Sequence, residues 1–414
     1  MASTYLTRTP SSNGNQKTWT FSAWIKNNGK SGDSTYQYLM EAYYSNGTRY
    51  SYVCLRHGTI ETYGGDYQTG SSTSLSFDVT TNRLLRDPSA WYHVVVAFDS
   101  TQSTNTDRVK IYINGVQETS FQGYVGGGSL TWPDQNDDTF FNVTTTQNRI
   151  GKEFDGSMSH IHFVDGTAYA PTAFGETDST TGEWKIKTDV SVTYGTNGFF
   201  ILKDGNSVTD QSGNSNNFTV AAGTLTNTED CPSNVFATGN PIHVDGTSAS
   251  AFINGNLTHT NNVGAVSSLA INKGKWYMEF KRQDNGGSIT NWMYCGFAKA
   301  DRTGLRLYRS SNGDYYNGSS YSSYGASWSD GDIVGVALDY DNDTIEFYKN
   351  GTSQGSKTSI GICDGDYVLP IWQCSQSSGS PYFHANFGNG YFGTTQISSE
   401  GTNASGIGKF EYDV

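Results

Sequence analysis

The stretch Gly-Lys-Trp-Tyr-Met-Glu-Phe at residues 274–280 decides the fold of this chain, because apolar and polar residues alternate along it. A similar pattern returns in Asp-Gly-Asp-Ile-Val-Gly-Val-Ala-Leu-Asp (330–339) and in Thr-Ile-Glu-Phe-Tyr-Lys-Asn-Gly (344–351). The runs Tyr-Val-Leu-Pro-Ile-Trp (367–372) and His-Ala-Asn-Phe-Gly (384–388) close the series. Alternation with turn residues at the ends is typical of half-buried antiparallel strands joined by tight turns.

The composition of the whole chain favours the all-β class. Among its 414 residues, Gly is abundant at 48, Pro is scarce at 8, and aromatic residues make up 14%. Long windows rich in Ala, Leu, Glu and Lys, which would indicate helices, are absent. Only 35% of the residues are hydrophobic. Aromatic side chains bury large areas each, however, so a packed core is still expected.

The charge and the termini of the sequence limit the partners and the location. The formal net charge is −13, and no cluster of Lys and Arg provides a basic face. Nucleic acid and anionic membranes are therefore not expected as partners. The first residues contain no apolar signal-peptide core, and no apolar run approaches the ~20 residues that span a bilayer. We expect a protein made in the cytoplasm, with no export signal and no membrane insertion.

The five cysteines are expected to be buried, apolar-like residues. Their number is odd in a large chain, which argues against a disulfide framework. No Cys-x-x-Cys pair exists, so a zinc knuckle has no support.

Four strand-like runs organise the first block of the chain, residues 1–175. The run Thr-Trp-Thr-Phe-Ser-Ala-Trp-Ile-Lys at 18–26 alternates, and its apolar face consists of Trp19, Phe21, Ala23 and Ile25. The other runs lie at 91–99, 108–115 and 150–164. The run at 108–115 ends on Asn-Gly, a dipeptide that favours a type I′ hairpin turn because both residues accept positive φ.

In this order the four runs resemble the laminin-G/concanavalin A-like lectin sandwich, which implies a concanavalin A-like jelly roll at residues 1–175. The runs of the second block resemble the SPRY domain, a β-sandwich that binds partners through end loops and performs no chemistry. This resemblance implies a SPRY-like sandwich at residues 241–414. Residues 176–240 contain buried-looking aromatics, and we expect them to form an ordered bridging segment packed on the sandwiches. The predicted fold is therefore all-β, with two antiparallel β-sandwiches.

The combination of both blocks is similar to structural proteins of tailed bacteriophages of marine bacteria. The stretches that carry this likeness are residues 5–26, 162–187 and 194–220. The resemblance implies a non-enzymatic surface protein of the virion, either a capsid decoration or a tail or fibre component. Its expected partners are other virion proteins and, as a further option, host-surface glycans. A homo-oligomer is expected. A dedicated host-receptor-binding adhesin is an alternative within the same class.

No catalytic residues are predicted. Glucanases of the concanavalin A-like fold carry a Glu-x-Asp-x-x-Glu pattern on one strand, and this chain has none. The nearest arrangement runs from Asp339 to Glu346, where Asp341 to Asp343 is expected to be a hairpin turn. It also fails as an EF-hand loop, because Thr344 replaces the required Gly. A polysaccharide-degrading enzyme on a glucanase-like sandwich is the alternative from another class.

Cofactors and metals are not predicted either. Many laminin-G-like domains bind calcium, so Asp155 and Asp165 are candidates in principle, although turn capping is the favoured explanation for both. His160 and His162 would share one face of a strand and form a metal pair, but no third ligand lies near them in sequence. The favoured alternative is that both flank the core or face solvent.

The strongest positive signal for a binding site is the segment 307–328, which consists almost wholly of Tyr, Ser, Gly and Asn. Antibody paratopes share this composition, since Tyr gives rigid contact area and the small residues give adaptable hydrogen bonds. We predict that it is an end loop for a ligand or partner. The alternative is that its aromatics cover the end of the sandwich. The candidate contacts are Arg306, Tyr308, Arg309, Tyr315, Tyr316, Tyr321, Tyr324 and Trp328.

A second tyrosine-rich stretch lies in the first block, at residues 36–67, and includes Tyr43, Tyr52 and Tyr63. Its alternation indicates strand, so packing on the core or on a sheet face is favoured over ligand contact.

Overall fold

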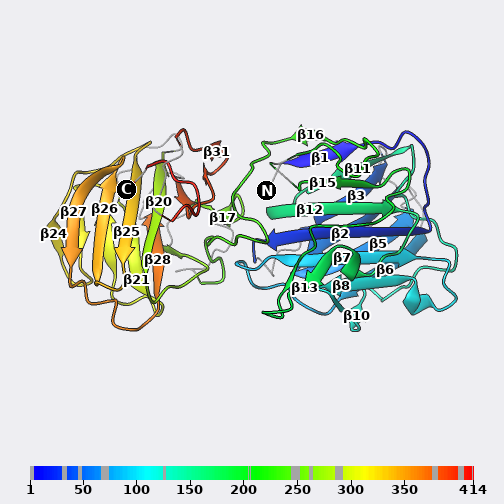
Figure 1. Cartoon of the computed structure of the whole chain (residues 1–414), viewed down its shortest axis with the longest axis horizontal. Coiled ribbons are helices and arrows are strands. Elements are labelled where there is room, and N and C mark those ends of the chain that lie inside the picture. The colour runs from blue at the N-terminus through cyan, green and yellow to red at the C-terminus, as the bar shows by residue number, and fades with distance from the viewer. Residues whose placement is uncertain are drawn as a thin grey trace. The chain divides into compact units, whose positions relative to one another are not determined.

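The structure is a computed structural model that describes every residue except 1–3, 30–34, 45–48, 67–73, 125–126, 204, 206, 244–251, 261–263, 285–291, 375–380, 400–404 and 413. Its regular structure is almost entirely antiparallel strand. Among the described residues, the helical elements are two 3₁₀ turns, η1 (Asn105–Asp107) and η2 (Pro171–Ala173). The predicted all-β class is confirmed. The chain divides into two compact units, Met1–Asn227 and Thr228–Val414 (Figure 1).

Two stacked sheets form the first unit. The eight-stranded sheet has the spatial order β10 (Phe121–Gln122), β6 (Ser74–Thr81), β5 (Thr59–Asp66), β4 (Arg49–Arg56), β3 (Gln37–Tyr44), β11 (Thr146–Ile150), β1 (Tyr5–Arg8) and β16 (Thr219–Ala222). The six-stranded sheet has the order β15 (Phe199–Ile201), β12 (Gly156–Asp165), β2 (Thr18–Asn27), β7 (Tyr92–Asp99), β8 (Val109–Ile113) and β9 (Val116–Gln117). In Figure 1, β2, β7 and β12 lie in front of β3, β5 and β6.

The core of the first unit lies between these sheets and uses the face predicted from the sequence. Trp19, Phe21, Ala23 and Ile25 of β2 are all fully buried in it. The Trp19 ring stacks on Phe98 at a centroid distance of 5.1 Å. Its Nε1 donates to Thr139 Oγ1 at 3.1 Å, so the indole polar atom is satisfied inside the core.

The predicted hairpin turn at Asn114 and Gly115 is confirmed. Both residues have positive φ, 49° and 78°, as a type I′ turn requires, and they connect β8 to β9.

The structure places most of the expected bridging segment, residues 176–240, on the first sandwich. The hairpin of β13 (Gly175–Thr177) and β14 (Trp184–Ile186) follows η2, and β15 and β16 then extend the two sheets. Val190, Val192 and Tyr194 pack against buried Val95 and Val164, on the side of the six-stranded sheet that faces away from the core. The aromatic and β-branched residues between 176 and 227 thus complete the first unit.

The second unit is also a pair of antiparallel sheets. The seven-stranded sheet has the order β17 (Phe252–Ile253), β18 (Thr258–His259), β29 (Tyr382–Asn386), β20 (Lys275–Gln283), β25 (Ile333–Asp339), β26 (Thr344–Lys349) and β27 (Thr352–Thr358). The six-stranded sheet has the order β19 (Gly264–Val266), β28 (Val368–Cys374), β21 (Met293–Lys299), β22 (Arg306–Arg309), β23 (Asp314–Tyr316) and β24 (Tyr321–Ser323). A short hairpin pairs β30 (Tyr391–Phe392) with β31 (Thr395–Gln396).

Alternate residues of β20 are buried on both faces of its sheet. Met278 and Phe280 enter the core, where the Phe280 ring lies 5.4 Å from that of Trp372. Glu279 points the other way and is fully buried, and its carboxylate accepts the backbone N–H groups of Glu411 and Tyr412, both at 2.9 Å. One carboxylate therefore fastens the C-terminal segment to the sheet.

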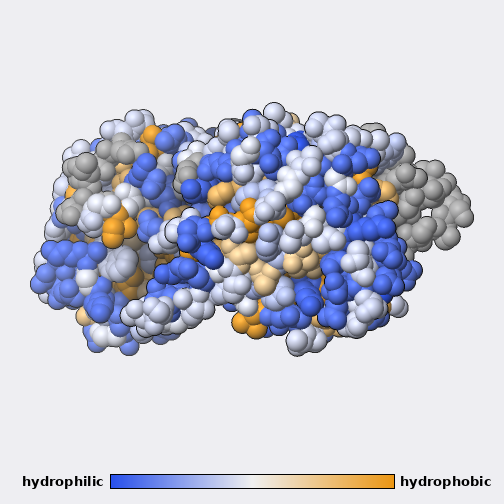
Figure 2. Space-filling model, turned by 45° about the vertical axis from the view of Figure 1, so that its right-hand side comes forward, coloured by the Kyte–Doolittle hydropathy of each residue, from blue (hydrophilic) through white to orange (hydrophobic). Residues whose placement is uncertain are grey.

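The outer surface is mostly hydrophilic. The face drawn in Figure 2 is mostly polar, with hydrophobic residues gathered near its middle and scattered elsewhere, as expected for a chain with few hydrophobic residues. Within the described ranges, no helix has the length and apolar character needed to cross a membrane.

Candidate functional site

The segment 306–328 is not the end loop that the sequence predicted. It forms the strands β22, β23 and β24, which extend the six-stranded sheet to its edge. Tight turns join these strands. Gly313 has a φ of 73°, and Asn317 Oδ1 accepts the N–H groups of Ser319 and Ser320 at 2.9 Å. The short polar residues that suggested a loop therefore serve as turns between strands.

Half of the predicted contacts point into the sandwich. Tyr308 and Trp328 are 0% and 2% exposed and belong to the core, together with buried Tyr315. The Tyr308 hydroxyl donates to the carbonyl of Ala326. Tyr324 is half-buried against this group, and its hydroxyl donates to the carbonyl of Gly355 on β27. These four side chains join the two sheets, so the prediction that they form an exposed contact surface needs correction.

The other aromatic candidates point outward, because neighbouring residues of a strand face opposite sides. Tyr316 pairs with Tyr321 across β23 and β24, and their ring centroids are 4.8 Å apart. Tyr294 on β21 pairs with Arg309 on β22, and its hydroxyl lies 3.3 Å from that of Tyr321. Trp292 stands just before β21. We call this group the aromatic platform, and it consists of Trp292, Tyr294, Arg309, Tyr316 and Tyr321.

Arg309 holds the aromatic platform together. The carbon of its guanidinium lies 3.7 Å from the centroid of the Trp292 ring and 5.0 Å from that of Tyr321. A cation over an exposed ring is worth about 0.5–1 kcal/mol. Trp292 and Tyr321 nevertheless remain 40% and 46% exposed. Both rings thus remain partly open to solvent while the cation is held in place, which suits contact with a sugar or with a protein.

Sequence reasoning found Arg309, Tyr316 and Tyr321 but missed Trp292 and Tyr294. These two lie about fifteen residues earlier, and only the pairing of β21 with β22 brings them to the same face. The remaining candidate, Arg306, faces the edge of the sandwich. Its Nε donates to the Ile360 carbonyl at 2.6 Å and its Nη1 to the Asn317 carbonyl at 2.6 Å.

A second group of polar side chains crosses the eight-stranded sheet of the first unit. The strand register places five residues side by side on the face opposite the core, in the order Arg149, Glu41, Tyr52, Tyr63 and Asp78. Tyr52 and Tyr63 stack at 5.0 Å, which agrees with the sheet-face packing predicted for the tyrosine-rich stretch 36–67. Residue 67 itself lies outside the described residues. We call this group the polar row.

Glu61 lies beside the polar row and is fully buried. Burial raises the pKa of its carboxyl to about 7, and the nearby Asp78 carboxylate adds to the rise. A hydrogen bond from the Tyr52 hydroxyl at 2.7 Å opposes it in part. Burial also raises the pKa of Asp78 and of Glu41, and Arg149, 3.2 Å from Glu41, counteracts the latter rise. Sequence reasoning missed this cluster, because its members come from separate strands.

The histidine pair predicted on β12 lies at a bulge. The register shifts between Ser159 and His162, and His160 has a positive φ of 48°. His162 is buried, its Nδ1 lies 2.7 Å from the Tyr194 hydroxyl, and its ring stacks on Phe200 at 3.9 Å. Burial lowers the pKa of His162 well below its usual value. The ring therefore packs on the sheet as an aromatic group.

The carboxylates considered for metal binding accept hydrogen bonds from backbone and side-chain N–H groups instead. Asp165 accepts the N–H of Asn15 at 2.7 Å and that of Asn197 at 2.9 Å. Asp155 accepts from the Asn28 side-chain amide at 3.1 Å. Asp341 to Asp343 forms the predicted turn between β25 and β26. Across the described ranges, no three His, Cys, Asp or Glu side chains gather in a group that could hold a metal ion.

Comparison with known families agrees with this architecture. Residues 2–172 match the concanavalin A-like lectin/glucanases superfamily, and residues 275–384 match the SPRY domain. The chain thus contains a concanavalin A-like domain followed by a SPRY domain. This combination fits a binding role.

Among solved structures, the SPRY domain of human HERC1 is 20% identical over 31% of this chain and 87% of its own, with a TM-score of 0.26. Another human SPRY domain is 20% identical over 31% of this chain and 91% of its own, with a TM-score of 0.25. No curated protein matches the chain. The family matches, rather than these two structures, identify the domains.

Proposed function

We propose that this chain is a non-enzymatic surface protein of a phage virion that binds its partners through the aromatic platform. The observation that carries the binding role is the position of Arg309 between two exposed rings, Trp292 and Tyr321. Exposed aromatic residues around an arginine are enriched at protein interfaces. Aromatic ring faces also stack on the apolar faces of sugars. The partners would be other virion proteins and, as the second option, host-surface glycans.

The virion context has its own support, separate from the platform. The stretches 5–26, 162–187 and 194–220 resemble structural proteins of marine tailed phages. In that setting the chain acts as a capsid decoration or as a part of the tail or fibre, and it assembles as a homo-oligomer. Virions of a phage that encodes the chain would be purified and examined by mass spectrometry and electron microscopy. Absence of the chain from the purified particles would refute this part of the proposal.

The binding role is tested with the isolated chain. Labelled protein would be incubated with particles that lack it, with host cells and with a glycan array. A decoration protein binds the particles and ignores the cells, whereas an adhesin binds the cells or a glycan. The variant Trp292→Ala should lose the observed binding. Trp276→Ala is the matched control, since Trp276 lies on the other sheet and is 49% exposed.

A second candidate function is polysaccharide hydrolysis on the first sandwich, and one observation favours it. Glu61 and Asp78 lie on adjacent strands with raised pKa values, as a general acid requires. Their burial opposes this candidate, because a substrate must reach both carboxylates. The test is release of reducing sugars from a panel of polysaccharides. Hydrolysis that Glu61→Gln abolishes would establish the enzyme and refute the non-enzymatic role.

A further inference from the structure

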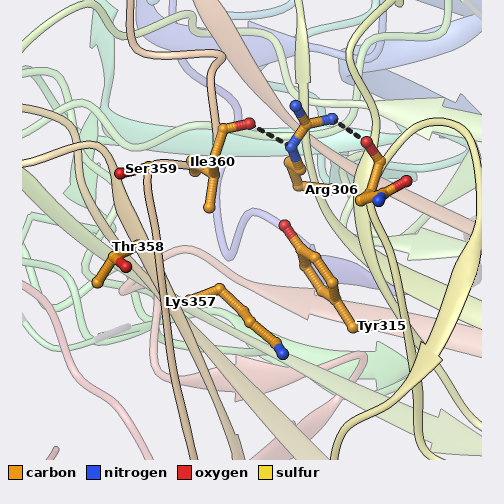
Figure 3. Close-up of a pocket in the computed structure, with 7 residues that line it drawn as sticks. Arg306, Tyr315, Lys357, Thr358, Ser359 and Ile360 are labelled. Atoms are coloured by element: carbon orange, nitrogen blue, oxygen red, sulfur yellow. Dashed lines mark hydrogen bonds between the residues drawn. The ribbon is translucent and has the colours of Figure 1, made fainter.

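A pocket opens at the edge of the SPRY domain, where β22 and β23 of one sheet meet β27 of the other (Figure 3). Its volume is about 230 Å³. Its lining includes the polar side chains of Arg306, Tyr315 and Lys357. We call it the edge pocket. None of its lining residues is acidic, although the chain as a whole has an excess of acidic residues.

Lys357 supplies a cation that has no counterion among the described residues. Its Nζ lies 5.5 Å from the centroid of the Tyr315 ring and 5.1 Å from that of Tyr324. Among the residues that the structure describes, no carboxylate pairs with it. By contrast, Lys349 lies 3.2 Å from Asp332 and Lys299 lies 2.6 Å from Asp364. The Lys357 ammonium is therefore held over two rings and keeps its hydrogen-bonding capacity.

Tyr315 adds a donor to the pocket, and in Figure 3 Arg306 lies beyond the Tyr315 hydroxyl, on the side away from the Lys357 ammonium. Arg306 uses Nε and Nη1 to hold the Ile360 and Asn317 carbonyls, while no bond from its Nη2 is found within the described part of the chain. In Figure 3 the Tyr315 hydroxyl points towards Arg306. Burial raises the pKa of Tyr315 to about 12, so the phenol keeps its proton at neutral pH and can donate.

One carboxylate, that of Asp343, is close enough to raise the pKa of Tyr315 through its charge. Asp343 is outside the lining, and its carboxylate is engaged by the N–H groups of Gly361 and Cys363, at 2.8 Å and 3.3 Å. The pocket thus has the ammonium of Lys357, the guanidinium of Arg306 and the phenol of Tyr315 in its lining. Such a set of donors binds charged acceptors better than neutral ones.

We propose that the edge pocket binds a small oxyanion, either the carboxylate of an acidic sugar or a phosphate group. Its volume is below the ~300–1,000 Å³ typical of drug-sized ligands, so it receives one charged group or a single sugar unit. This site is separate from the aromatic platform, and it does not require the virion context.

The test is a ligand-detected NMR titration of the full chain at low salt with sodium glucuronate, inorganic phosphate and neutral glucose. Saturable binding of an anion but not of glucose is expected. Binding of glucuronate alone would identify a site for an acidic sugar. Binding of phosphate, with or without binding of glucuronate, would identify a general oxyanion site. Lys357→Met should weaken binding at least about tenfold, and Tyr315→Phe several-fold, because hydrogen bonds to charged groups are strong. Lys357→Arg should retain most of it.

Lys273→Met is the matched control, because it removes the same charge from an exposed position of the same domain outside the edge pocket. It should bind the anion like the unmodified chain. The proposal is overturned if glucose binds as well as the anions, if neither anion binds, or if Lys357→Met and Lys273→Met weaken binding equally.

Discussion

The guanidinium carbon of Arg309 lies 3.7 Å from the centre of the Trp292 ring. Arg309 belongs to β22, and Trp292 precedes β21, the strand that pairs with it. The contact fixes an arginine on a sheet face where the ring and its neighbour Tyr321 stay accessible to solvent. Since the Arg309 side chain is already ordered, binding of a partner costs little further side-chain entropy.

Removing the stacked pair should therefore reduce binding more than stability. We expect Arg309→Ala and Trp292→Ala each to weaken binding to particles or glycans at least about tenfold, the loss typical of interface hot spots. The free energy of unfolding should change by about 1 kcal/mol or less, because Trp292 is 40% exposed, Arg309 is only half-buried, and a cation over an exposed ring contributes little. Binding by surface plasmon resonance and unfolding in urea would be measured together. Unchanged binding by both variants would contradict the platform's role.

The inward-facing residues of the same segment should behave in the opposite way. Trp328→Ala should lower the stability of the SPRY domain by about 3–5 kcal/mol, because it empties a site packed against Phe383. Tyr308→Phe should cost about 1 kcal/mol through the lost hydrogen bond to Ala326. Tyr321→Phe serves as the exposed comparison, with little expected effect. Urea unfolding followed by limited proteolysis of this domain would check all three variants.

Glu61 should make the first domain less stable as the pH rises. Its folded pKa of about 7 exceeds the ordinary value of 4.5, so the folded state binds more protons between these limits. The stability it contributes is complete below about pH 4.5 and is lost as the pH passes 7. The expected loss is on the order of 3 kcal/mol.

Glu61→Gln should abolish this part of the pH dependence, because an amide does not titrate. Its oxygen can still accept the hydrogen bond from the Tyr52 hydroxyl. Melting temperatures at pH 5 and pH 8 would be compared with those of Glu183→Gln, which changes an exposed carboxylate. If Glu61→Gln and the unmodified chain lose equal stability between these pH values, Glu61 does not carry the effect.

His93 should show the reverse pH dependence and a single tautomer. Trp184 Nε1 donates to its Nδ1 at 3.0 Å, so the proton of the neutral ring must lie on Nε2, which then donates to Ser22 Oγ at 2.8 Å. Burial lowers the pKa of His93 to about 3, below its ordinary 6.5. The folded state thus binds fewer protons, and its stability falls as the pH drops below 6.5.

Long-range ¹H–¹⁵N NMR should show protonated Nε2 of His93 from pH 8 to pH 5. Trp184→Phe should remove this constraint, and a proton on Nδ1 in the unmodified chain would contradict the assignment.

The alternation of apolar and polar residues was enough to predict the strands, and the resemblance of their order to two known families implied the two sandwiches. The face made by Trp19, Phe21, Ala23 and Ile25, and the hairpin turn at Asn114 and Gly115, follow from local rules, because side-chain direction has a period of two and positive φ favours Asn and Gly. The period of two also places Tyr308 and Arg309 on opposite faces of β22. The composition of 307–328 had instead suggested a loop, in which this rule does not apply.

The tertiary structure decided which residues meet. The polar row joins β11, β3, β4, β5 and β6, and the aromatic platform joins residues before and within β21 to β24. A sequence specifies the two faces of each strand, whereas the register between strands depends on how entire sheets pair and pack. For this reason the sequence by itself determined an all-β chain and the apolar and polar face of each strand. Strand pairing within one sheet placed Trp292 against Arg309, and the packing of the two sheets on each other placed Lys357 over Tyr315.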